Sequence, residues 1–196
     1  LIVPALAELA VATQPLRLIG AKKWRELAGA VGHATLVGLS TLAGVVIYLG
    51  INAKVSGNPL QFTIYQKEHW YQGVGFLPDT LRYIGENALN ERFNSIGMAI
   101  WIPELVLFVL GVVLLVYGFR RQRLAMSLYL LVYIGCVYSA TWLLSAGRYL
   151  ACAVPVFMIA GEWLAKRERQ KMAVYWLSGA LFMVYMIAYL LGRQVM

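Results

Sequence analysis

The sequence contains few charged and few chemically reactive side chains. Charged residues make up 13% of the 196 positions, and the chain has two cysteines and two histidines. It lacks the glycine-rich loop that binds nucleotides, the spacing that binds zinc and the serine motif of hydrolases. Cys136 and Cys152 lie in apolar segments, so we expect them to be small buried side chains that form neither a disulfide nor a metal site. These absences exclude the common classes of soluble enzyme, and we expect neither a metal nor a cofactor.

Hydrophobic residues dominate the chain instead. They make up 61% of it and give a mean hydropathy of +0.68, which lies outside the range of soluble domains and indicates an integral membrane protein. The net charge of +8 comes from basic residues in short clusters beside apolar segments. The excess of positive charge at the cytoplasmic ends of membrane spans explains this pattern. We therefore expect membrane lipids as partners and exclude nucleic acid.

The apolar segments predict an all-α fold, a polytopic membrane helix bundle with five to six transmembrane helices. We expect residues 1–196 to form a single transmembrane domain that is the C-terminal part of a longer protein. Basic clusters at 17–25, 120–123 and 166–171 all fall on one side of the predicted bundle, which should be cytoplasmic. The predicted spans are residues 1–19, 27–51, 95–119, 124–144, 148–164 and 172–191.

One long polar stretch, residues 52–94, interrupts this pattern between the second and third predicted spans. It begins with a turn at 56–59 and carries two short amphipathic segments, at 60–71 and 77–89, suited to lie at the membrane surface. The basic clusters place this loop on the external face. Chemistry that involves water, sugars or phosphates is expected there or at its edges.

The loop contains a compact group of polar and aromatic residues: Gln66, Glu68, His69 and Trp70. A tryptophan beside hydrogen-bonding groups is a common arrangement for binding a sugar, because the ring covers the apolar sugar face. The alternative is an aromatic anchor at the membrane interface, which composition alone favours.

Arg148, followed by Tyr149, begins the fifth predicted span on the same external side. Its guanidinium is always charged and matches the geometry of phosphate oxygens, so a lipid phosphate is a suitable ligand. The alternatives are a side chain that reaches to the membrane surface, or a salt bridge with Glu104 in the third span. The residues leave these readings evenly balanced.

Short motifs follow one another between residues 48 and 157. They are Tyr48, Gly57-Asn58-Pro59-Leu60, Phe62, Gln66 and Trp70, then Ser145, Arg148-Tyr149-Leu150 and Pro155-Val156-Phe157. This order resembles the C-terminal half of the PIG-V family, the GPI mannosyltransferase 2 type, with its bacterial relatives. The family pattern is G-D-P-L-x-F, three residues, Q, a short gap and W, then S-x-x-R-Y-L and an F-P helix. Asn58 stands where the family usually has Asp, and Val154 stands where Phe is common.

The resemblance implies a GT-C-type membrane glycosyltransferase. Its donor would be a polyprenyl or dolichyl phosphate sugar, typically mannose, and its acceptor a glycolipid or glycan. Arg148 and Tyr149 would bind the donor phosphate, and Gln66, His69 and Trp70 would line the sugar or acceptor side. In the family a carboxylate of the first external loop acts as base, and we expect that loop to precede Leu1, so we assign no catalytic residue here.

Two other classes compete with this interpretation, a transporter or flippase subunit and a non-catalytic membrane scaffold. A transporter commonly has inverted repeats and broken helices, and neither is evident in the sequence. A scaffold needs neither the His-Trp pair nor the arginine at a tight external turn. The loops contain no Asn-x-Ser/Thr site, so a bacterial plasma membrane is favoured over the endoplasmic reticulum.

Overall fold

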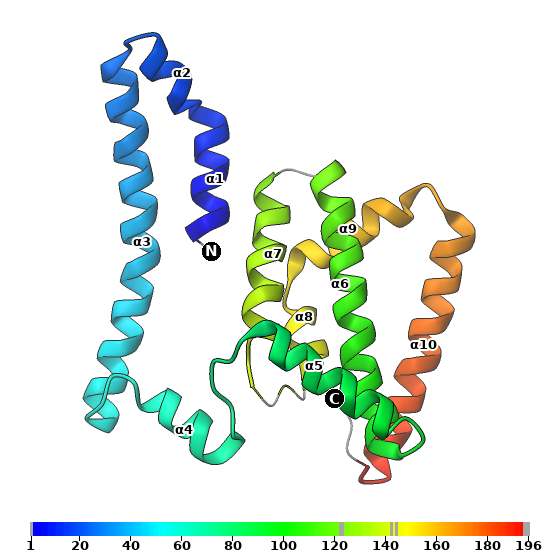
Figure 1. Ribbon diagram of the computed structural model, residues 1–196. Helices are drawn as coiled ribbons and strands as arrows, with labels where there is room; N and C mark the ends of the chain where they lie inside the picture. Colours follow the sequence, from blue (N-terminus) through cyan, green and yellow to red (C-terminus); the bar gives the residue numbers. More distant parts are fainter. Residues whose placement is uncertain (1, 122–123, 142, 144, 194–196) are drawn as a thin grey trace. The chain divides into compact units, whose positions relative to one another are not determined.

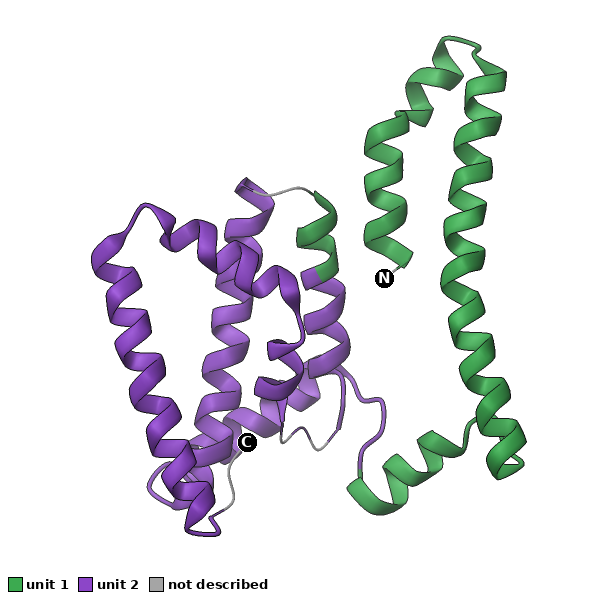
Figure 2. Cartoon of the chain, turned by 180° about the vertical axis from the view of Figure 1, so that it is seen from behind, with its two compact units in different colours: residues 1–71, 123–129 green, residues 72–122, 130–196 purple. Residues whose placement is uncertain are grey.

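The computed structural model describes residues 2–121, 124–141, 143 and 145–193, and this part of the chain is mainly helical (Figure 1). It divides into two compact units, residues 1–71 with 123–129, and residues 72–122 with 130–196 (Figure 2). Each unit is described by itself below. The single transmembrane domain expected over 1–196 stays a prediction.

The first unit begins with two helices where one span was predicted. α1 covers Ile2–Thr13 and α2 covers Pro15–Gly20. Gln14 between them adopts a left-handed conformation with φ of 46°. Proline restricts the residue before it and offers no N–H to the preceding turn, so the helix stops before Pro15. The continuous span predicted for residues 1–19 is therefore wrong.

α3, Trp24–Ser56, is the longest helix, and the predicted start of the external loop at residue 52 lies inside it. It ends at Gly57, whose φ of 75° is left-handed and whose N–H bonds the Ala53 carbonyl at 2.9 Å. None of its 33 residues is buried, although the helix is strongly apolar. Such a helix is stable when its surroundings are lipid. α4, Gln61–Trp70, follows it, and the rings of Tyr48 and Phe62 join the two helices with centroids 5.3 Å apart.

The second unit contains α5 (Leu77–Asn90), a π-helical turn (Gly97–Trp101), α6 (Ile102–Arg121), most of α7 (Leu124–Tyr138), α8 (Ala146–Ala151), α9 (Val154–Ala165) and α10 (Glu168–Leu190). The predicted amphipathic segment at 77–89 is confirmed as α5. It buries Thr80, Ile84 and Ala88 along one face and exposes the Arg82–Glu86 ion pair, 2.7 Å long, on another. The core includes buried apolar side chains from five helices: Ile84, Leu114, Leu130, Tyr138, Leu150 and Ile159.

Three helices are long and apolar enough to cross a membrane: Trp24–Ser56, Gly97–Arg121 and Glu168–Leu190. The chain is thus a helical membrane protein. Three further apolar helices, α1, α7 and α9, have 10–17 residues each, which is shorter than a full span. Whether they also cross the bilayer stays a prediction.

α7 ends at Tyr138, before residue 144, where the fourth span was predicted to end. The following residues pair with the segment before α5: Gly75 N–H bonds the Ser139 carbonyl at 2.6 Å, and Thr141 N–H bonds the Gly73 carbonyl at 2.9 Å. A Cβ at Gly75 would lie 2.8 Å from the Thr141 methyl carbon, so glycine permits this close approach. The predicted span was too long because this pairing links positions far apart in sequence. Residues 142 and 144 lie outside the described part.

The fifth predicted span, 148–164, is also wrong as a single helix, because the chain breaks between α8 and α9. Pro155 is the cause: it has no N–H to donate to the Ala151 carbonyl, and its ring would clash with that carbonyl in a continuous helix. It lies instead in the first turn of α9, where proline is well tolerated. The break leaves Cys152 exposed, and Cys136 is exposed on α7, so the predicted burial of both thiols is wrong as well.

Candidate functional site

The three predicted sugar-binding residues of the loop lie together on α4. Gln66, His69 and Trp70 are spaced i, i+3 and i+4, so they share one face of the helix, and all three are exposed. The His69 ring meets the Tyr65 ring edge-on, with centroids 5.6 Å apart. α4 therefore presents an amide, an imidazole and an indole side by side, a set that can hydrogen-bond and stack on a sugar ring.

Arg148 and Tyr149 lie in the second unit, in the middle of the six-residue helix α8, and both are exposed. Among the described residues, no carboxylate forms an ion pair with Arg148. The helix around it is short and lies within an otherwise apolar part of the chain. A cation in such a place can bind an anion without first breaking a salt bridge.

Two hydrogen bonds hold the backbone of α8 in place. The Ala146 N–H donates to Glu104 Oε1 on α6 at 2.7 Å, and the Tyr133 hydroxyl on α7 donates to the Tyr149 carbonyl at 2.8 Å. One contact lies just before Arg148 and the other just after it. α8 is thus fixed to two neighbouring helices, while the guanidinium itself stays exposed.

Glu104 is the buried polar group of this arrangement. Its side chain is 0% exposed, and its main-chain carbonyl accepts a hydrogen bond of 2.9 Å from the Tyr138 hydroxyl. The second carboxyl oxygen, Oε2, has no hydrogen-bond partner among the described residues. The salt bridge with Arg148 considered from the sequence is not formed, because Glu104 bonds the backbone of α8 instead. In the sequence, the position of Glu104 inside an apolar span indicated a functional or structural role for its carboxylate. The sequence could not show that the carboxylate would accept a hydrogen bond from the Ala146 N–H.

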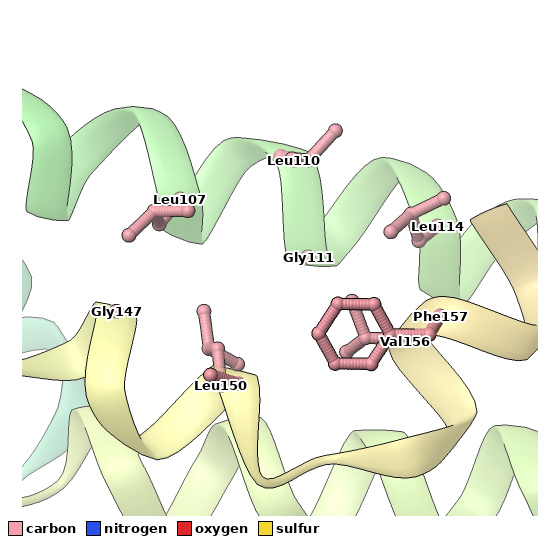
Figure 3. A pocket seen from close by; sticks show the side chains of 9 residues that line it. Leu107, Leu110, Gly111, Leu114, Gly147, Leu150, Val156 and Phe157 are labelled. Atoms are coloured by element: carbon pink, nitrogen blue, oxygen red, sulfur yellow. The ribbon is translucent and has the colours of Figure 1, made fainter. Parts of the chain in front are cut away.

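An apolar groove of about 210 Å³ lies beside α8, in the second unit (Figure 3). It is lined by α6, α8 and α9, including Leu107, Leu114, Leu150, Val156 and Phe157. Sequence reasoning missed this groove. It exists because the chain breaks before Pro155 and turns α9 away from the line of α8.

The five predicted site residues thus form two sets, one on α4 in the first unit and one on α8 in the second. Each set is brought together within its own helix, and their union in one site stays a prediction. Comparison with protein-family models, curated proteins and solved structures finds no match for this chain. The resemblance to the PIG-V family therefore depends on the motifs between residues 48 and 157.

Proposed function

We propose that this chain is part of an integral-membrane glycosyltransferase of GT-C type with five to six membrane spans. It transfers a sugar, mannose in the family that it resembles, from a polyprenyl or dolichyl phosphate donor to a glycolipid or glycan acceptor on the external face of a bacterial plasma membrane. Arg148 binds the donor phosphate, with Tyr149 beside it. Gln66, His69 and Trp70 line the sugar or acceptor side.

The observation that carries this proposal is the exposed guanidinium of Arg148 on a backbone fixed by Glu104 and Tyr133. In glycosyl transfer from a lipid phosphate, negative charge develops on the leaving phosphate as the glycosidic bond breaks. A cation held in position stabilises that charge and does not have to reorganise during the reaction. The fork of donors on arginine also matches two phosphate oxygens at once.

Replacement of Arg148 tests this function. Loss of a charge-assisted contact in a site that excludes water costs about 2–4 kcal/mol, or roughly thirty- to a thousandfold in rate. Arg148→Ala should lose nearly all of this, and Arg148→Lys should lose part of it because an ammonium cannot reproduce the fork. The measurement is mannose transfer by the protein that contains this chain, in detergent and per mole of folded protein.

Arg169 offers a matched control, because it is exposed, lies near the start of α10 and belongs to a predicted cytoplasmic cluster. Arg169→Ala should leave transfer unchanged. Well-folded Arg148→Ala protein with normal transfer over a range of donor concentrations would remove the phosphate role.

The break between α8 and α9 favours a transporter or flippase subunit as a second candidate, because transporters commonly bind their substrates at broken helices. The two functions leave different products. Proteoliposomes supplied with labelled lipid-linked sugar and acceptor should yield glycosylated acceptor if the chain belongs to a transferase. Movement of labelled lipid between leaflets without a new glycosidic bond would support the transporter.

A further inference from the structure

The side chains that line the groove beside α8 are all apolar. Its walls are leucine, valine, phenylalanine, alanine and glycine residues only. Figure 3 shows Leu107 and Leu114 on the α6 side, facing Leu150, Val156 and Phe157 on the α8 and α9 side. Gly111 of α6 and Gly147 of α8 also line the groove. A groove of this composition offers no side-chain hydrogen bond to a polar ligand.

The groove also lies at membrane depth. Leu107 and Leu114 belong to the middle of the apolar span Gly97–Arg121. Its rim is open, because Phe157 is 59% and Leu110 44% exposed. A ligand that reaches it from the bilayer is a hydrocarbon chain, since a soluble ligand would have to cross the lipid.

Its size fits several carbon atoms of such a chain. The volume is about 210 Å³, whereas an apolar cavity of roughly 150 Å³ in another protein stays dry and binds benzene. An unfilled groove leaves the carbon atoms of its walls without contacts on one side. A hydrocarbon chain supplies those contacts.

The charge beside the groove indicates what the chain is attached to. Gly147, Leu150 and Ala151 line the groove from one face of α8. Arg148 follows Gly147 directly, about 100° around the helix, so it borders the same face. It is exposed and forms no ion pair with a described residue. A hydrocarbon chain in the groove with an anionic head at this end would meet the guanidinium.

We propose that the groove between α6, α8 and α9 holds the first isoprene units of a polyprenyl phosphate whose phosphate is bound by Arg148. The proposal rests on the proposed function, which supplies the polyprenyl phosphate, and it adds the site that selects the lipid part of the donor. The short helix α8 then performs two tasks, because one of its faces contacts the chain and the neighbouring residue contacts the phosphate. Discrimination between lipid donors and soluble sugar phosphates is expected to arise here.

Photocrosslinking tests the proposal without requiring turnover. The probe is a polyprenyl phosphate with a diazirine in its second isoprene unit, added to the protein that contains this chain in detergent. Labelled peptides should come from residues 107–114 and 147–157. Ala151→Trp, which projects a large ring from an exposed lining position, should lower labelling strongly. Excluding even two methylene groups from the groove lowers affinity by about tenfold.

Two controls keep the result interpretable. Val109→Trp adds the same ring at an exposed position of α6 outside the groove, and it should label as the unsubstituted protein does. If Ala151→Trp protein does not elute as a folded species on size exclusion, Leu107→Trp takes its place. Polyprenol lacking the phosphate should compete poorly with the probe, and Arg148→Gln should remove the advantage of the phosphate.

The outcomes separate this inference from the function on which it rests. Labelling of the groove without sugar transfer would support the binding site and reject the transferase. Normal transfer with unchanged labelling in Ala151→Trp and Leu107→Trp would support the transferase and overturn the groove. Equal competition by phosphatidylglycerol would show that ordinary membrane lipid fills the groove, which would also overturn the proposal.

Discussion

At the scale of single residues, Glu104 is a fully buried carboxyl group in the second unit. One carboxyl oxygen accepts the Ala146 N–H, and the other has no partner among the described residues. Burial of a carboxyl group is unfavourable unless its oxygens are bonded, so this residue holds α8 at some expense to stability. Its position explains how a backbone next to Arg148 stays fixed in an apolar environment.

Two substitutions of Glu104 should distinguish the contribution of its acceptor oxygen to stability from the contribution of its charge. Glu104→Leu leaves the Ala146 N–H buried without a partner, which costs about 1–3 kcal/mol of stability. Glu104→Gln keeps an acceptor oxygen, so its loss should be smaller. The measurement is the Tm of each purified variant, taken from the fraction that remains folded after heating in detergent.

The exposed carboxylate Glu162 on α9 provides the comparison for this series. Glu162→Leu should leave the Tm close to that of the unsubstituted protein. A Glu104→Leu variant as stable as the original would mean that the bond to Ala146 contributes nothing to folding.

At the scale of elements, the junction between α5 and α6 depends on a π-helical turn. The Asn94 side chain accepts the N–H of Ile96 at 2.8 Å and of Gly97 at 3.2 Å, so it caps the start of the third span. Trp101 Nε1 donates to a carboxyl oxygen of Glu91 at 3.3 Å across the same turn. The chain doubles back tightly here, and glycine at 97 is what permits it.

Gly97→Ala should therefore destabilise the protein, because a Cβ at this position would overlap the main-chain carbonyl of Glu91. The backbone cannot move aside as a flexible side chain can, so the loss should be about 1–3 kcal/mol. Gly85→Ala is the matched control. Gly85 is in the interior of α5 with no atom within 4 Å of its ideal Cβ, and alanine there should stabilise the helix by about 0.5–1 kcal/mol.

In thermal unfolding, a lower Tm for Gly97→Ala and a higher Tm for Gly85→Ala would confirm the π-helical turn. A Gly97→Ala protein that is as stable as Gly85→Ala would show that residues 91–97 adopt a different backbone.

At the scale of the whole molecule, membrane topology decides whether the residues of α4 and Arg148 on α8 lie on the same side of the membrane. The basic clusters predict that α4 and α8 both face the external side, while the end of α6 faces the cytoplasm. This placement is needed if Gln66 and Arg148 are to act on the same substrate.

Single cysteines at Gln66 and Arg121 test this arrangement in a background that lacks Cys136 and Cys152. Both positions are exposed, so both should react with a thiol reagent that cannot cross membranes. In intact cells only the cysteine at 66 should be labelled, and the cysteine at 121 should be labelled only after the membrane is opened. Labelling of both from one side would contradict the topology and the proposed site with it.

The sequence by itself determined the class of the protein and its longest helices. Hydrophobic composition requires a lipid environment, and apolar length located the spans that became α3, α6 and α10. Local patterns also sufficed for α5, because its hydrophobic period is set within 14 residues. Proline effects were available in the sequence as well, since Pro15 and Pro155 act on the helical turn that precedes them.

Only the tertiary structure decided where α7 ends, which atom Glu104 bonds and that a groove lies beside α8. Each of these depends on residues that are distant in sequence: Gly73 pairs with Thr141, and Glu104 meets Ala146. Hydrophobic periodicity shows which face of a helix is buried, but it does not show which other element packs against that face. Contacts between distant residues are therefore decided by packing in the folded protein. For the same reason the sequence could offer Arg148 as a phosphate ligand, while the fixed backbone around it and the apolar groove at its side emerged only from the fold.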